Sequence, residues 1–118
     1  MIKILGMSLI TQTGSPAIAT LTLESDGKHQ TTQATAKGPI GAIFAAIRKI
    51  VPHDHLTLER YEAKSLGSTH DAVASVRVQI SDGCRVVGST HEDIDTFLAS
   101  AWAYVGALNE MFVPVTVD

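Results

Sequence analysis

The sequence predicts an α+β fold made of two repeated strand-strand-strand-helix (βββα) units, with antiparallel sheets that carry their helices on one face. Two Asp-Gly pairs, which begin at Asp26 and Asp82, are strong hairpin signals and lie 56 residues apart. Pro39 and Asp95, which open the two predicted helices, are separated by the same 56 residues. We therefore expect a single domain over residues 1–118, with one unit at about 7–52 and the other at about 56–112.

Three strands are expected in the first unit. The first covers Met7–Thr13 and is closed by Gly14 and Pro16. In the second, at residues 17–23, apolar residues recur at every second position, which is typical of a half-buried strand. After the turn, the Thr- and Gln-rich stretch Lys28–Ala36 supplies the return strand.

The first helix begins at Pro39, where the missing N–H and the fixed φ of proline are favourable, and Pro52 ends it. The backbone N–H groups of Ile40 and Gly41 have no partner inside the helix, and Gly41 has no side chain to shield them. A small anion can approach this turn, and Lys37 adds a positive charge nearby. One face of the helix is an apolar stripe that needs a sheet to cover it, formed by Ile40, Ile43, Phe44, Ile47 and Ile50.

The second unit repeats this order: a strand without a clean apolar face, a turn, an alternating strand, a hairpin turn and the start of a return strand. These are expected at Leu56–Ser65, Gly67–His70, Ala74–Ile80, Asp82-Gly83 and Arg85–Gly88. The inward positions of the two alternating strands differ in phase by one residue, so the repeat is structural and inexact.

The second helix is capped by Asp93 or Asp95 and runs to about Phe112. It is apolar nearly all round, with a stripe and a flank formed by Ile94, Leu98, Ala101, Val105, Leu108 and Phe112, and by Ala99, Trp102, Ala103 and Gly106. Such a helix is buried on more than one side. We expect the second cover from another subunit, in an intertwined or face-packed homodimer. The alternative is a helix lodged between the chain's own two sheets.

Composition excludes several classes of protein. The single Cys84 rules out an intramolecular disulfide, and with no signal-peptide pattern the expected compartment is the cytoplasm. No apolar run approaches the roughly 20 residues of a membrane helix. A net charge of -3, with 9 scattered basic residues, is not the electrostatic pattern of a nucleic-acid-binding protein. We therefore expect neither membrane nor nucleic acid as a partner.

Candidate catalytic groups are few. His53 and His55 lie two apart and can share a metal in a small metal-dependent enzyme, but cationic groups are also favourable just after a helix, and no third ligand is identifiable. Cys84 has no base nearby in the sequence. No nucleophile elbow, phosphate loop or dinucleotide-binding motif is present. We therefore expect no catalytic residues, no metal and no cofactor.

Three segments together resemble the C-terminal regulatory domain of alpha-isopropylmalate synthase and its relative citramalate synthase. The matching residues are Lys37–Ala42; Tyr61, Ser65, Gly67, Asp71, Ala72 and Ala74; and Ala99–Asn109, which is the most specific segment. The resemblance spans about Ser8 to Met111. It implies a dimeric sensor of leucine or isoleucine that inhibits a separate catalytic barrel, and a barrel of roughly 250 residues is absent from this chain.

The resemblance also implies where such a ligand binds. The amino-acid carboxylate suits the turn formed by Gly38, Pro39, Ile40 and Gly41. The ammonium group meets carbonyls near Ser65 to Gly67 or the side chain of Asp71, and the branched side chain lies among Ile40, Tyr61, Ala72 and Ala74. The second helix is a poorer anion site because Glu92, Asp93 and Asp95 crowd its start.

Two departures from the family pattern bear on function. Ala36 replaces the first glycine of the family's Gly-x-Gly-Pro, and residues Ser89 to Glu92 break a second Gly-x-Gly before the last helix. The sequence therefore leaves two functions open: a branched-chain amino-acid sensor, and a structural homodimerisation module whose pocket is vestigial.

Overall fold

The computed structural model describes residues 1–51 and 55–112. Its elements are β1 (Ile2–Ile10), β2 (Ala17–Ser25), β3 (Lys28–Ala36), α1 (Pro39–Ile50), β4 (Thr57–Ser65), β5 (Ala74–Ser81), β6 (Val86–Asp93) and α2 (Thr96–Phe112). The strands form two three-stranded antiparallel sheets, β1-β2-β3 and β4-β5-β6. The predicted α+β fold of two βββα units is confirmed.

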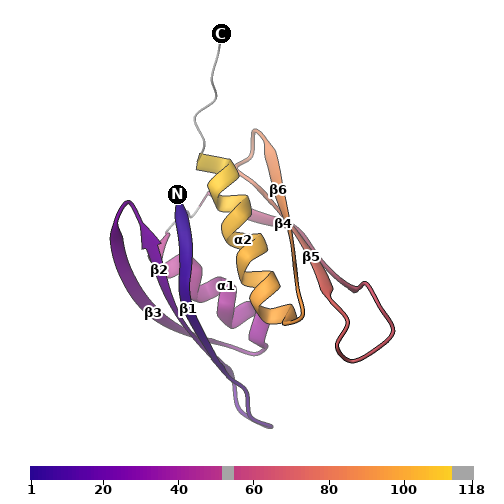
Figure 1. Cartoon of the computed structure of the whole chain (residues 1–118). Helices are drawn as coiled ribbons and strands as arrows, with labels where there is room; N and C mark the ends of the chain where they lie inside the picture. The colour runs from indigo at the N-terminus through magenta and orange to yellow at the C-terminus, as the bar shows by residue number, and fades with distance from the viewer. Residues whose placement is uncertain (52–54, 113–118) are drawn as a thin grey trace.

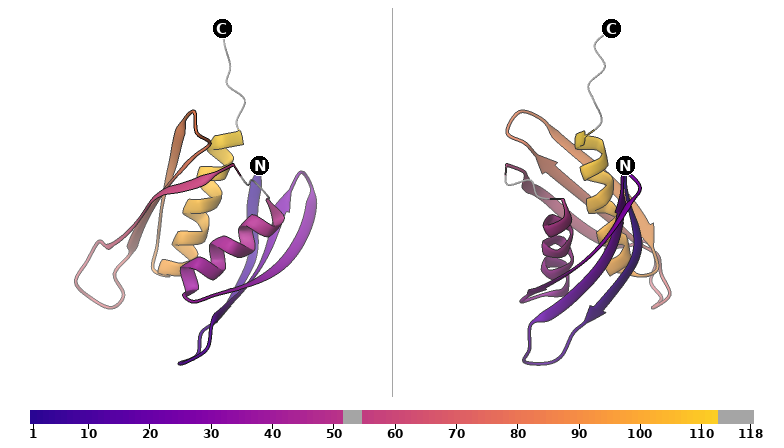
Figure 2. Two further views of the ribbon diagram at one scale, coloured as in Figure 1. Left: turned by 180° about the vertical axis from the view of Figure 1, so that it is seen from behind. Right: turned by 90° about the vertical axis from the view of Figure 1, so that its left-hand side faces the viewer.

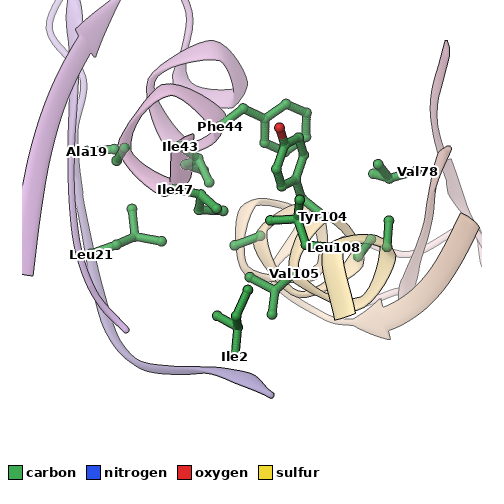
Figure 3. Packing of buried hydrophobic residues seen from close by; sticks show 14 of the residues in the cluster. Ile2, Ala19, Leu21, Ile43, Phe44, Ile47, Val78, Tyr104, Val105 and Leu108 are labelled. Atoms are coloured by element: carbon green, nitrogen blue, oxygen red, sulfur yellow. The ribbon is translucent and has the colours of Figure 1, made fainter. Parts of the chain in front are cut away.

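The two helices lie between the two sheets (Figures 1 and 2). Each helix packs on the sheet of its own unit, α1 on β2 and β3 and α2 on β5 and β6, and the helices contact each other. Figure 3 shows how side chains from both sheets and both helices meet in one core. The fully buried residues include Leu21, Leu23, Ile43, Ile47, Val76, Val78, Ile80, Val105 and Leu108.

The two Asp-Gly hairpins differ in construction. Asp26 and Gly27 have φ values of 53° and 80° and connect β2 directly to β3, as a type I′ turn requires. In the second hairpin, four residues separate β5 from β6. There one carboxylate oxygen of Asp82 accepts hydrogen bonds from the amides of Cys84 (2.8 Å) and Arg85 (2.9 Å). The predicted difference in phase is confirmed, because the buried apolar positions are odd-numbered in β2 and even-numbered in β5.

The first strand begins earlier than expected, at Ile2 rather than Met7, and it ends at Ile10. A register shift between Ile4 and Gly6 marks a bulge opposite β2. Because a bulge moves the inward positions by one residue, it breaks the regular alternation by which a strand is recognised. Ile2 is 5% exposed, so the strand is part of the core from its first residue.

The second cover of α2 comes from its own chain. Besides β5 and β6, α2 contacts β1 and α1. The rings of Tyr104 in α2 and Phe44 in α1 have their centroids 4.5 Å apart. The all-round apolar character of α2 is therefore explained by a helix lodged between the two sheets of one chain, and a second subunit is not needed for it. Two residues of the expected stripe stay exposed, Ile94 at 65% and Phe112 at 41%.

Polar contacts join the last helix to β1 and to the β5–β6 connection. The amide of Ile2 donates to Oδ1 of Asn109 (2.8 Å), and Nδ2 of Asn109 donates to the carbonyl of Ile2 (3.0 Å). One side chain thus binds the first residue of β1 as a neighbouring strand would. At the end of α2, Nη2 of Arg85 donates to the carbonyl of Met111.

Candidate ligand-binding site

The first turn of α1 is open. Gly38 is the N-cap, in an extended conformation (φ −124°, ψ 162°), and as a glycine it has no side chain to cap the helix. Pro39 follows it, and the amide of Ala42 donates to the carbonyl of Gly38 (3.1 Å). The amides of Ile40 and Gly41 precede this first helical bond and have no acceptor among the described residues. The partial positive charge of the helix N-terminus is therefore unopposed there.

The start of α2 is closed by its own carboxylates. Oδ1 of Asp95 accepts from the amides of Phe97 (2.9 Å) and Leu98 (3.2 Å), and Oδ1 of Asp93 accepts from the amide of Asp95 (2.8 Å). Asp95 rather than Asp93 is thus the N-cap. The two helices of the repeat differ in what an incoming anion would find, because in α2 a side chain already occupies the position that is open in α1.

A pocket of about 350 Å³ lies where the β4–β5 connection meets the start of α2. Its lining residues are Ala63, Lys64, Ser65, Thr69, His70, Ala72, Ala74, Ile94 and Thr96. Local hydrogen bonds hold the connection: Oγ of Ser65 donates to the carbonyl of Gly67 (2.7 Å), and the amide of Leu66 donates to the carbonyl of Val73 (2.8 Å). The pocket wall therefore combines small apolar side chains with hydroxyl groups.

The structure brings some of the predicted site residues together and not others. Ser65, Ala72 and Ala74 line the pocket, and Gly67 lies in the same connection, where an added Cβ would be 3.1 Å from Cβ of Ala72. Asp71 is outside the lining; its carboxylate is 3.6 Å from Nε2 of His70, and both side chains are exposed. The open turn of α1, from Gly38 to Gly41, is a separate element of the site.

Both helices begin toward the end of the molecule where the β4–β5 connection projects (Figures 1 and 2), and residues of this connection line the pocket. Tyr61 of β4 does not line the pocket, but it contacts both helices. Its ring contacts Phe44, one turn after Ile40, with centroids 5.8 Å apart and planes at 73°. Its hydroxyl is 2.7 Å from Oγ of Ser100, which in turn donates to the carbonyl of Thr96 at the pocket wall (2.8 Å).

Sequence reasoning missed Ser100, which contacts Tyr61, and six of the residues that line the pocket: Ala63, Lys64, Thr69, His70, Ile94 and Thr96. A buried serine in an otherwise apolar stretch was the available signal for Ser100, because a polar side chain survives there only with a partner.

The metal hypothesis finds no support in the described part of the chain. His53 and Asp54 lie outside it, and within residues 1–51 and 55–112 no group of three His, Cys, Asp or Glu side chains is placed to hold a metal ion. Cys84 is exposed. Neither α1 nor α2, the helices among the described residues, is long and apolar enough to cross a membrane.

Comparison with known proteins identifies the family. A family model described as "LeuA allosteric (dimerisation) domain" matches residues 1–112. The chain belongs to this family. Proteins named 2-isopropylmalate synthase are similar to it: that of Methylorubrum populi is 43% identical over 110 residues and that of Methylobacterium nodulans 39%, each match covering 93% of this chain. The relative from Bradyrhizobium sp. strain BTAi1 is 38% identical over the same length.

The chain spans about one fifth of the length of these relatives, 21% in each case. The family is a regulatory one, and its description covers allostery and dimerisation. The resemblance drawn from the three sequence segments is therefore confirmed, and the chain is a regulatory domain rather than a catalytic one.

Proposed function

We propose that this domain binds a branched-chain amino acid, leucine or isoleucine, and through it exerts feedback inhibition on an alpha-isopropylmalate or citramalate synthase. The observation that carries the proposal is the open first turn of α1, which has a glycine N-cap and two free amides. In α2, the other helix of the repeat, Asp95 closes the same position. The family's description as an allosteric domain supports a ligand of this kind.

In the proposed complex the amino-acid carboxylate accepts hydrogen bonds from the amides of Ile40 and Gly41, near the charge of Lys37. The ammonium group meets the carbonyls of the Ser65–Gly67 connection or the carboxylate of Asp71. The branched side chain packs among Ile40, Tyr61, Ala72 and Ala74. The ligand changes the activity of a catalytic partner because it binds one conformational state of the domain more tightly than the other.

Titration calorimetry and thermal shift with leucine, isoleucine, valine and glutamate test the proposal. A ligand at 100 times its dissociation constant stabilises the fold by about 2.7 kcal/mol. We expect leucine or isoleucine to raise the melting temperature and glutamate to leave it unchanged. If none of the branched-chain amino acids has an effect at millimolar concentration, the proposed function is wrong.

Two substitutions of Gly38 locate the carboxylate. Gly38→Asp places a carboxylate where Asp95 stands in α2; the position has an extended φ, and an added Cβ would meet nothing within 4 Å. The variant should fold with a stability gain of about 0.5 kcal/mol and lose amino-acid binding, because its own carboxylate occupies the amides. Gly38→Ala adds a side chain without the charge and is the matched control, expected to keep most of the binding.

A structural homodimerisation module with a vestigial pocket is the second candidate, and Ala36 favours it. Ala36 replaces the first glycine of the family's Gly-x-Gly-Pro pattern, and its Cβ lies 3.4 Å from the place where a Cβ on Gly41 would be. This candidate predicts that the chain sediments as a dimer at all ligand concentrations and that Gly41→Arg, which blocks the turn, changes neither the dimer nor the melting temperature in the presence of leucine. The sensor predicts that Gly41→Arg abolishes the shift caused by the amino acid.

A further inference from the structure

Ser100 is a polar residue buried in the apolar helix α2, with no exposed surface. Its hydroxyl has one proton, which it donates to the carbonyl of Thr96 (2.8 Å). The proton in its 2.7 Å contact with Tyr61 therefore comes from Tyr61. The result is a directed chain of hydrogen bonds that starts on β4 and ends at the first residue of α2.

These hydrogen bonds also hold the ring of Tyr61 in place. The ring meets Phe44 edge to face, and Phe44 in turn contacts Tyr104, so Tyr61 is held by packing on one side and by its hydroxyl on the other. Tyr61 shares the inner face of β4 with Ala63 and Ser65, since these residues pair in register with the buried Val78, Val76 and Ala74. Ala63 and Ser65 line the pocket, whereas Phe44 belongs to the helix whose first turn is open.

We infer that Ser100 is a positioning residue of the effector site, which acts through Tyr61 and selects among branched-chain side chains. In the proposed complex the branched side chain of the ligand packs against Tyr61, so Ser100, which holds this ring through its hydroxyl, fixes one wall of the space for that side chain. The inference rests on the proposed function. Ligands that differ by one methylene are discriminated only when the wall that they meet is held in place.

Two substitutions remove the tether in different ways. Ser100→Ala leaves the half-buried Tyr61 hydroxyl free to turn toward water. Tyr61→Phe keeps the ring, and Ser100 still donates to Thr96. Thr22→Val is the control, because it removes an exposed hydroxyl pair with Thr31 (2.8 Å) on the β2 face turned away from the buried Leu21 and Leu23.

Calorimetry gives dissociation constants of the wild-type chain and each variant for leucine, isoleucine and valine. We expect Ser100→Ala and Tyr61→Phe each to raise the dissociation constant of the preferred amino acid about tenfold. The ratio of dissociation constants between the least favoured and the preferred amino acid should fall about fivefold. The double variant should be no worse than either single variant, since both remove the same hydrogen bond. Thr22→Val should change neither quantity.

The outcomes separate the two hypotheses. If the wild-type chain discriminates among the amino acids and both variants lower the melting temperature with the preference unchanged, Ser100 is only structural and the inference is overturned while the proposed function stands. If the two single variants add up in the double variant, the hydrogen bond is not the agent and the inference is also overturned. If the wild-type chain binds none of the amino acids, the proposed function is wrong and the inference is wrong with it.

Discussion

Gly106 provides the sharpest test of the packing between α2 and the second sheet. A glycine inside a helix costs about 1 kcal/mol relative to alanine, so at an open position Gly106→Ala would stabilise the domain by that amount. Here a Cβ on Gly106 would lie 2.2 Å from Oγ of Ser89 and 2.9 Å from its Cβ. The hydroxyl can rotate away, but Cβ of Ser89 is fixed to β6, so the helix or the strand must move.

The expected magnitude follows from these two terms. Inserting a methyl group into a packed contact costs about 1–3 kcal/mol, which cancels or exceeds the gain in helix propensity. Gly106→Ala should therefore destabilise the wild-type chain by about 0–2 kcal/mol. In a Ser89→Gly background both obstructing atoms are gone, and the same substitution should stabilise the chain by about 1 kcal/mol.

Urea denaturation of the four members of this cycle measures the coupling between the two positions, expected at about 1–3 kcal/mol. Gly41→Ala is a matched helix glycine, because its Cβ would make only an ordinary 3.4 Å contact with Ala36, and it should stabilise by up to about 1 kcal/mol. If Gly106→Ala stabilises the wild-type chain as much as the Ser89→Gly chain, α2 does not approach β6 as closely as described.

Three further predictions concern polar groups. Hydrogen bonds from the amides of Arg85 and Cys84 lower the pKa of Asp82. The contribution of Asp82 to stability is therefore complete above its unfolded-state pKa of about 3.9 and is lost as the pH falls below that value. Urea titrations should show a smaller loss of stability in acid for Asp82→Asn, whose side-chain oxygen still accepts both hydrogen bonds. Burial raises the pKa of Tyr104, although the positive charge of Arg48 opposes this shift. The free energy of unfolding of the wild-type chain should therefore fall as the pH rises above about 10. An equal fall at high pH in Tyr104→Phe would contradict this. Asn109→Ala removes both partners of the Ile2 backbone and should lower the free energy of unfolding by about 1–3 kcal/mol in urea, a result that a change within 0.3 kcal/mol would refute.

Local patterns predicted most of the fold. The Asp-Gly turns, the alternation in β2 and β5 and the Pro39 start of α1 each depend on residues adjacent in the sequence, and each lies where it was expected. The start of β1 was missed because a bulge disturbs the alternation. The composition of α2 showed that it is buried on more than one side, but composition does not say which surface covers a helix, and β1 and α1 of the same chain do so.

The candidate site was predicted in the same uneven way. The open turn at Gly38 to Gly41 was visible because helix capping is local. The contact of Ser100 with Tyr61 joins residues 39 positions apart, and no periodicity in the sequence reports such a pair. Local sequence signals therefore do not reach the contacts between side chains of different elements, and the proposed selection of a ligand depends on such contacts.

The bond between Asn109 and Ile2 has a consequence for how the domain is made. The two residues are separated by 107 positions, so at about 5–20 residues per second the ribosome needs roughly 5–20 s to deliver the partner of the first strand. During that interval β1 can pair with β2, but the apolar side of β1 that contacts α2 has no cover. The repeat therefore does not divide the chain into two halves that mature one after the other: the first unit is completed by the last turns of the second.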